Sequence, residues 1–195
     1  MRILVIGATG TIGRAVVSAL SQGNEILAAS RNGAVKVDVS DPANIKAMYR
    51  SVGKVDAVVC AAGSAVFKPL DQLTDQDYRF CLDNKLMGQV NVIRFGFEHV
   101  ADGGSITVTS GVLAQNPMAG AAAISMVNVG LEGFVRGAAL EAARKIRVNV
   151  VSPPWVTETL IAFKMDPKGG KPAADVAKAY IASVAGKQTG ATIAA

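Results

Sequence analysis

The sequence predicts an α/β fold: one domain, built on a doubly wound parallel sheet with helices on both faces. Short apolar runs alternate along the chain with longer segments of helical periodicity, the pattern of strands and crossover helices. The first apolar run, residues 2–6, leads directly into three glycines and then a helical segment. A chain of 195 residues that is 50% hydrophobic can bury one good core, so residues 1–195 are expected to form a single domain.

The three glycines are Gly7, Gly10 and Gly13, between a predicted buried strand at 2–6 and a helix over 15–20. A strand, a glycine turn and a helix in this order leave free backbone N–H groups where a pyrophosphate binds well. Gly7 allows the tight turn, Gly10 lets the backbone approach a phosphate, and Gly13 lets the helix pack on the strand. The spacing is not the common G-x-G-x-x-G, and an ordinary turn without a ligand is the alternative. The position after a buried strand favours a Rossmann-type dinucleotide site, with further contacts from Thr9, Thr11 and Ile12.

The second predicted strand, residues 25–30, indicates which dinucleotide is preferred. An acidic residue often follows this strand and holds the ribose hydroxyls of NAD. This chain has Ser30 and Arg31 instead, a hydroxyl and a cation that suit a 2′-phosphate. Charge-assisted hydrogen bonds of about 1.5–3 kcal/mol would give roughly ten- to hundredfold preference for NADP(H). The alternative is that Arg31 is a solvated turn residue.

The third predicted strand, residues 34–39, follows the second almost at once. The intervening segment is too short for a crossover helix, which takes a dozen or more residues. We therefore expect a short edge strand without the usual preceding helix, and an open site at the adenosine end. Asp38 either faces the adenine or caps the next turn, and Val39 is assigned to the same cofactor site.

The next elements follow from caps and apolar runs. Asp41 as N-cap and Pro42 at the first position predict a helix to about Val52. A strand at 55–60 leads into Ala61, Ala62 and Gly63, which are small enough for the backbone to lie against a cofactor. The remaining predicted elements are a helix over about 74–99 with a weak break at Gly88, a strand at 104–111, a helix over about 119–143, a strand at 146–151, a helix at 173–185 and a strand at 191–194. The single histidine, His99, falls at the end of the long helix, where it would interact with the helix dipole.

The composition limits the classes of partner and the location expected for this chain. The net charge of +5 is modest and its lysines and arginines are scattered, which argues against nucleic-acid binding. No apolar run is long enough to cross a membrane, and the first residues lack a signal pattern. Cys60 and Cys81 fit reduced thiols, so a cytoplasmic location is expected. No metal is expected.

Several motifs in order resemble the short-chain dehydrogenase/reductase family over essentially the whole chain. The glycine turn matches, and Cys60-Ala61-Ala62-Gly63 stands for the family's Asn-Asn-Ala-Gly. Thr109-Ser110-Gly111 lies where the family keeps its catalytic serine. Leu131-Glu132-Gly133-Phe134 and the run from Ile146 to Pro153 match the family's later helix and sixth strand.

The chain departs from the family at the catalytic helix. The family pairs a tyrosine, which gives the substrate oxygen its proton, with a lysine four residues later. The matching positions here hold Ile124 and Asn128, and a slip by one residue gives Ala123. None of the three tyrosines has a lysine four residues on.

The residues that remain suggest a partial replacement. Ser110 could polarise a carbonyl oxygen, and Asn128 could bond a ribose hydroxyl. The resemblance places Lys85 where the family has a helical asparagine, with Asn84 beside it. Lys85 either restores a cation or proton donor to the site or is a solvated helical lysine. Ser125 is a weaker candidate, because an unperturbed hydroxyl is a poor acid.

A short loop over about 155–171 is expected to cover the substrate. It follows Pro153 and begins with Trp155 and Val156, assigned to the cofactor. Thr157 or Thr159 could bond the nicotinamide amide. Phe163 and Met165 would line an apolar lid, although ordinary packing explains them equally well.

Two function classes remain. The first is an NADP(H)-dependent oxidoreductase acting on a small carbonyl or alcohol with a degenerate catalytic site. The second is a cofactor-binding protein without dehydrogenase activity, acting as a sensor or partner subunit. Chemistry on a sugar nucleotide is disfavoured because no substrate domain follows the sheet. In either class the resemblance implies a homodimer or homotetramer through the helices at about 74–99 and 119–143.

Overall fold

The computed structural model describes residues 1–195 and contains a seven-stranded sheet in the order β3-β2-β1-β4-β5-β6-β7. Every pair of neighbouring strands is parallel, as predicted. The chain moves outward from β1 in one direction and then returns to add β4 on its other side, which makes the β1/β4 boundary the switch point. The strands are β1 (Arg2–Ile6), β2 (Glu25–Ser30), β3 (Val35–Lys36), β4 (Val55–Cys60), β5 (Val100–Thr109), β6 (Arg147–Ser152) and β7 (Thr192–Ala194).

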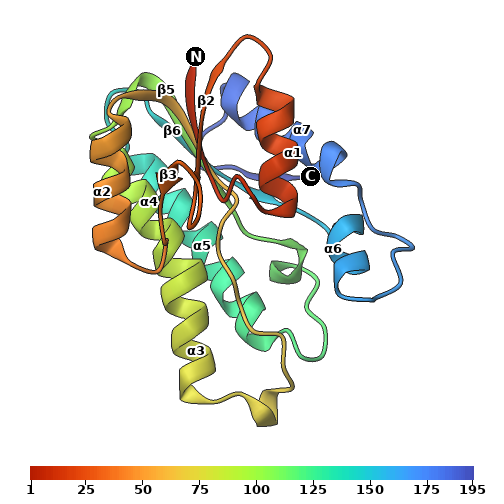
Figure 1. Cartoon of the computed structure of the whole chain (residues 1–195). Helices are drawn as coiled ribbons and strands as arrows, with labels where there is room; N and C mark the ends of the chain where they lie inside the picture. The colour runs from red at the N-terminus through yellow and green to blue at the C-terminus, as the bar shows by residue number, and fades with distance from the viewer.

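Helices cover both faces of the sheet (Figure 1). One face carries α1 (Thr11–Leu20) and α7 (Ala173–Ala185), and the other carries α2 (Pro42–Val52), α4 (Gly88–Gly96) and α5 (Ala122–Glu141). Each face therefore has its own apolar core, and the strands contribute alternate side chains to the two cores. None of the helices is both long enough and apolar enough to span a membrane.

Two local predictions are confirmed. Asp41 Oδ1 accepts a hydrogen bond from the backbone N–H of Ala43 at 2.8 Å, so α2 begins with the expected cap and with Pro42 in its first position. The third strand is only two residues long, lies at the sheet edge, and has no helix before it.

The long helix predicted over 74–99 is three segments. Between α3 (Asp75–Cys81) and α4 lies a π-helical stretch, η2 (Leu82–Met87). Gly88 packs directly on the segment after β3, because a Cβ atom at Gly88 would lie 2.9 Å from the Val39 carbonyl oxygen. The helix ends at Gly96, so His99 lies beyond it, and its ring stacks on Tyr49 with centroids 5.1 Å apart. The boundary predicted at His99 is therefore wrong.

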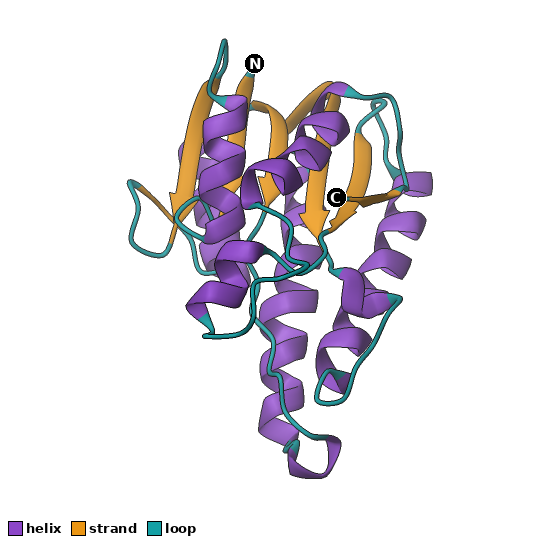
Figure 2. Ribbon diagram, turned by 90° about the vertical axis from the view of Figure 1, so that its right-hand side faces the viewer, coloured by secondary structure: helices purple, strands orange, loops and turns teal.

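Smaller differences concern element ends and the substrate loop. β5 begins at Val100 and ends at Thr109, rather than spanning 104–111, and α5 is shorter than the predicted 119–143 at both ends. The segment 155–171 contains a short helix, α6 (Thr157–Ala162), which buries Leu160. Figure 2 shows the strand arrowheads pointing to the end of the molecule where loops, short helices and α3 gather. Ligands of parallel α/β sheets bind at this end.

Candidate functional site

Two hollows lie side by side at the carboxyl ends of the strands. The larger, about 530 Å³, is lined by Lys85, Ser110 and Asn128 together with apolar side chains, and we call it the Lys85 cavity. The smaller, about 290 Å³, is lined by the glycine turn and the ends of β2 and β4, and we call it the glycine-turn hollow. Asn84 lines the glycine-turn hollow and the next residue, Lys85, lines the Lys85 cavity, so the two hollows adjoin at this point of the chain.

The glycine turn is built for close backbone approach. Gly7 has φ of +83°, and a Cβ atom there would lie 2.8 Å from the backbone nitrogen of Ala62. A Cβ atom at Gly13 would lie 1.9 Å from the Gly7 carbonyl oxygen, so no side chain fits between α1 and the turn. Helix α1 has Gly10 as its N-cap and receives no side-chain cap, which leaves its first N–H groups for an anion. This cradle fits a dinucleotide pyrophosphate.

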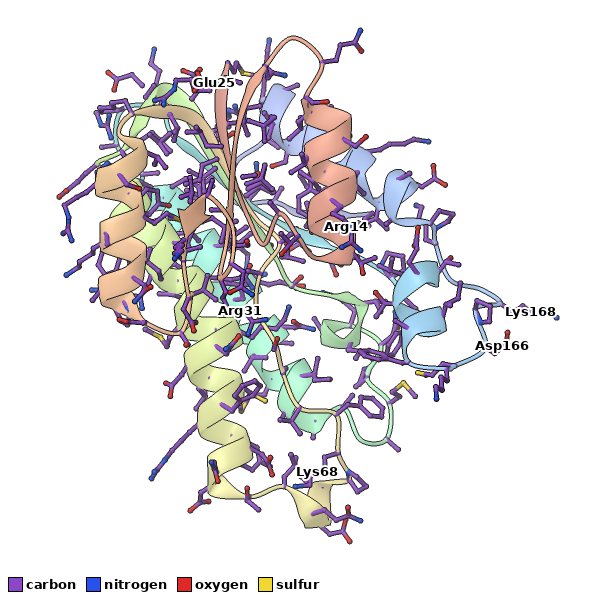
Figure 3. The ribbon with its side chains drawn as sticks, in the orientation of Figure 1. Arg14, Glu25, Arg31, Lys68, Asp166 and Lys168 are labelled. Carbon is purple, nitrogen blue, oxygen red and sulfur yellow. The ribbon has the colours of Figure 1, made fainter.

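Arg14, in the first turn of α1, contacts the glycine turn and was not predicted as a site residue. Its guanidinium donates a 2.6 Å hydrogen bond to the Thr9 carbonyl oxygen and so braces the turn. Figure 3 shows Arg14 and Arg31 near the middle of the molecule, both well away from Glu25 at the other end of β2. Arg31 lines the glycine-turn hollow, and Arg14 is bonded to the turn itself.

The end of β2 presents a hydroxyl and a cation to the glycine-turn hollow. Ser30 and Arg31 both line it, and the Ser30 Oγ atom is buried without a hydrogen-bond partner. Arg31 is exposed and takes part in none of the four ion pairs. An orphaned hydroxyl beside an unpaired arginine fits a phosphate group.

Asp38 also lines this hollow, and its carboxylate accepts hydrogen bonds from the hydroxyl of Ser40 at 2.7 Å and from its backbone N–H at 3.0 Å. These bonds lower the pKa of Asp38. Of the two roles left open for Asp38, turn capping is confirmed. Facing the adenine stays a prediction.

Most other predicted cofactor residues line one hollow or the other. The glycine-turn hollow takes Gly7, Thr9, Gly10, Val39, Ala61, Ala62 and Gly63, and the Lys85 cavity takes Ile12, Pro153, Trp155 and Val156. Thr11, Gly13 and Thr157 line neither. Thr157 begins α6 and packs against Gly170, whereas Thr159, one of the two residues considered for the nicotinamide amide, does line the Lys85 cavity.

Lys85 is positioned by η2 at the end of β5. Its ammonium donates hydrogen bonds to the carbonyl oxygens of Thr109 and Ser110, each at 3.2 Å. Burial lowers the pKa of Lys85 from 10.5 to about 8, because desolvation disfavours the charged form. Two of the three N–H groups of the ammonium have partners, and one remains for a ligand. The alternative of a solvated helical lysine is wrong. A π-helical turn is a frequent feature of functional sites.

The hydroxyl of Ser110 already donates a hydrogen bond to another side chain of the protein. Its Oγ donates a 2.8 Å hydrogen bond to Glu132 of α5, and the residue is 3% exposed. The second carboxylate oxygen of Glu132 accepts a 2.7 Å hydrogen bond from the Gln115 amide. For Ser110 to polarise a substrate carbonyl, it would have to give up its bond to Glu132. The sequence reasoning missed Glu132 and Gln115 as members of the site.

The two positions matched to the family's tyrosine and lysine do face the Lys85 cavity. Ile124 and Asn128 both line it, one helical turn apart on α5. Asn128 is 2% exposed, its amide nitrogen makes a long 3.5 Å contact with the Gly111 carbonyl oxygen, and its Oδ1 atom is buried without a partner. Ser125 has an unpartnered buried hydroxyl but does not line the cavity. The cavity therefore lacks a phenol where the family has one.

Apart from Thr159, the side chains in the rest of the cavity wall are apolar. Trp155, Phe163 and Met165 of the 155–171 segment lie along it, and Phe67, from the loop after β4, completes it. Phe67 was not predicted as a site residue, because the sequence around it does not differ from that of an ordinary loop containing an aromatic residue. The sequence predictions for Phe163 and Met165 agree with their position.

Comparisons with known proteins agree with this geometry. A family model described as "Enoyl-(Acyl carrier protein) reductase" matches residues 9–191. The hydroxynaphthalene reductase-like protein Arp2 of Metarhizium brunneum is 31% identical over 133 residues, which cover 65% of this chain and 50% of that protein. An uncharacterized oxidoreductase of Methylorubrum extorquens is 29% identical over 178 residues, covering 78% of this chain and 72% of that protein. The chain spans about half the length of the Arp2 proteins that it matches.

Solved structures are similar over the whole chain. The protein lin1944 from Listeria innocua has a TM-score of 0.95 and 40% identity, with 100% of this chain and 98% of that chain covered. A small-chain dehydrogenase in complex with NADPH has a TM-score of 0.88 and 26% identity, with 100% and 96% covered. With the family model, the sheet order and the glycine turn in agreement, the chain belongs to the short-chain dehydrogenase/reductase family.

Proposed function

We propose that this chain is an NADP(H)-dependent oxidoreductase that interconverts a small carbonyl compound and its alcohol. The observation that carries the proposal is the ammonium of Lys85, which lies in an apolar cavity directly beside a hollow that fits a dinucleotide. The family is one of oxidoreductases, and a structural neighbour was solved with NADPH.

Cofactor binding is assigned to the glycine-turn hollow and the adjoining part of the Lys85 cavity. The backbone of Gly7 to Gly13 and the N-terminus of α1 would hold the pyrophosphate, and Ser30 with Arg31 would hold a 2′-phosphate. Asn128 would accept a hydrogen bond from a ribose hydroxyl through its unpartnered Oδ1. When bound, the cofactor supplies or accepts a hydride.

Lys85 would donate the proton to the substrate oxygen during reduction. A carbonyl oxygen that gains negative charge needs a proton, and positioned proton transfer typically contributes about 10²–10⁴-fold to the rate. A pKa of about 8 keeps most of the Lys85 amine protonated at neutral pH while leaving the proton easy to transfer. Its two bonds to strand-end carbonyls fix the ammonium in the cavity.

A second candidate is a cofactor-binding protein without turnover, serving as a sensor or partner subunit. Two observations favour it: Ile124 occupies the place of the family's proton donor, and the Ser110 hydroxyl is bonded to Glu132. Both candidates share the NADP(H) site and differ only in the proton chemistry. In either case we propose self-association through α3–α4 and α5, and a reducing, cytoplasmic location that suits the two free cysteines.

The experiment measures cofactor binding and turnover separately. NADPH at a hundred times its dissociation constant should raise the unfolding free energy by about 2.7 kcal/mol, and NADH at the same concentration should raise it less. Under NADPH, the wild-type chain should reduce small ketones slowly, and Lys85→Met should lose this activity while it still binds NADPH. Binding without any turnover would favour the sensor.

A double substitution that restores the family's tyrosine and lysine tests whether the Lys85 cavity is the reaction site. Ile124→Tyr with Asn128→Lys should raise reductase activity, because both positions line the cavity and the lysine tunes the tyrosine. Either change alone should do less. If the double variant binds NADPH but gains nothing, the cavity is not where the carbonyl reacts.

A further inference from the structure

The Lys85 cavity has its one cation at the end of the sheet and exposed apolar side chains where it meets solvent. At the sheet end, the Lys85 ammonium is held by the carbonyl oxygens of Thr109 and Ser110 at the end of β5. At the surface end, three cavity-lining side chains stay open to solvent: Phe67 is 50% exposed, Phe163 66% and Met165 42%. The cavity therefore runs from a single cation outward to exposed apolar surface.

Gly111 and Asn128 lie close together beside Lys85, since a Cβ atom built at Gly111 would lie 3.2 Å from the Asn128 amide nitrogen. Both residues line the cavity, as does Ile124, one turn from Asn128 on α5. A carbonyl group at Lys85 can carry an apolar substituent toward Phe67, Phe163 and Met165, which line the same cavity and are exposed to solvent.

The small number of free hydrogen-bond donors in the cavity favours an uncharged ligand. Lys85 is the only ionisable side chain in the lining, and backbone carbonyls already accept from two of its three N–H groups. The other polar side chains in the lining are Ser110, Asn128 and Thr159, and Ser110 already donates to Glu132. A carboxylate or phosphate would therefore leave most of its oxygen lone pairs without a donor. A neutral carbonyl oxygen needs no more than the one N–H group that remains on Lys85.

We propose that the substrate is an uncharged carbonyl compound with its C=O at or next to one end of an apolar body, the oxygen at Lys85 and the body against Phe67, Phe163 and Met165. This rests on the proposed function and names its substrate class. In the reductive direction the carbonyl carbon gains a hydride from the reduced nicotinamide, and the carbonyl oxygen gains the proton of the Lys85 ammonium. The product is the terminal or next-to-terminal alcohol, and the neutral amine regains its proton from water.

Isomeric ketones test where the carbonyl must lie. With NADPH, kcat/KM for 2-octanone should exceed that for 4-octanone by at least about tenfold, although the two isomers are almost equally apolar. Along the series from 2-butanone to 2-octanone, kcat/KM should rise by up to about fourfold per methylene, equivalent to about 0.8 kcal/mol. Equal values for the two octanones would overturn the proposal.

Matched variants test which side chains hold the apolar body. Phe163→Ser should reduce the ratio of kcat/KM for 2-octanone over 2-butanone by about tenfold. Ile161→Ser is the control, because Ile161 lies two residues before Phe163, in α6, is 59% exposed and does not line the cavity. An unchanged ratio in Phe163→Ser, or an equal fall in Ile161→Ser, would contradict the assignment.

Binding can be read without turnover, because the single tryptophan, Trp155, lines the cavity. Titration of the cofactor-free chain with 2-octanol should change Trp155 fluorescence saturably, with tighter binding than 2-butanol and weaker binding in Phe163→Ser. Saturable binding of 2-octanol without ketone reduction would refute the proposed function, and with it the substrate, and would leave only the placement of an apolar body in this cavity. Ketone reduction without preference between the octanones, or no saturable signal with 2-octanol, would refute the inference.

Discussion

Replacing Lys85 by methionine should stabilise the fold at neutral pH while removing the proton donor. Below about pH 8 the amine is charged in both the folded and the unfolded chain, so the folded state carries the full cost of burying the charge. A pKa lowered from 10.5 to about 8 corresponds to at most about 3 kcal/mol. Loss of the hydrogen bond to the Ser110 carbonyl oxygen opposes this by about 1 kcal/mol, whereas the Thr109 carbonyl oxygen still accepts a hydrogen bond from the Gln89 side chain. The net gain at pH 7 should therefore be about 2 kcal/mol.

The gain should disappear as the pH rises. Between about pH 8 and pH 10.5 the folded chain loses the Lys85 proton while the unfolded chain still holds it, so the wild type recovers stability in this window. Urea unfolding of both proteins at pH 7 and pH 10, followed by circular dichroism, measures the difference directly. Lys187→Met, at an exposed position, is the control and should show no such pH dependence.

One result would refute this reasoning. If Lys85→Met were less stable than the wild type by the same amount at pH 7 and at pH 10, burial of the Lys85 charge would carry no net cost. The buried carboxylate of Glu132, which is bonded to the side chain of Ser110, would then be the group to examine as its compensation. Retention of full ketone reductase activity in Lys85→Met would separately remove Lys85 from the proton chemistry.

Three further predictions follow from other parts of the molecule. Arg31→Ala should lower the affinity for NADPH roughly ten- to hundredfold, so that NADPH raises the melting temperature no more than NADH does. If NADPH still raised it more than NADH in this variant, Arg31 would not bind the 2′-phosphate. Gly13→Ala should cost about 3 kcal/mol or more in urea unfolding, because its Cβ would lie 1.9 Å from a backbone oxygen. Gly137→Ala, in α5, should raise the free energy of unfolding by up to about 1 kcal/mol, because a Cβ atom there would have no neighbour within 4 Å. Similar effects of the two substitutions would contradict the argument that Gly13 is required for close packing. Val129→Glu, at a 49% exposed position of α5, should convert a dimer or tetramer into monomers by light scattering, whereas a monomeric wild type would refute self-association through this helix.

The fold could be predicted because its determinants are local. The apolar run of β1, the glycines that follow it and the Asp41-Pro42 cap each act within a few residues. The missing crossover helix was likewise a matter of chain length, since four residues cannot form one.

Helix interruptions and the short helix in the 155–171 segment were not predicted. The η2 stretch has ordinary helical composition, and nothing in its sequence requires the wider π-helical turn that places Lys85 at the end of β5. Helix α6 has six residues, too few to show a clear periodicity, and it is stabilised by burying Leu160.

Sequence patterns alone predict the sheet, the glycine turn, the absence of the tyrosine–lysine pair and the residue types available to replace it. How those residues are used depends on contacts between distant parts of the chain. The hydroxyl of Ser110 is bonded to Glu132, 22 positions away, and the ammonium of Lys85 to carbonyls 24 and 25 positions away. Charge and hydrogen-bond state depend on burial and on partners from other elements, and these partners meet only when α5 and η2 pack against the end of β5.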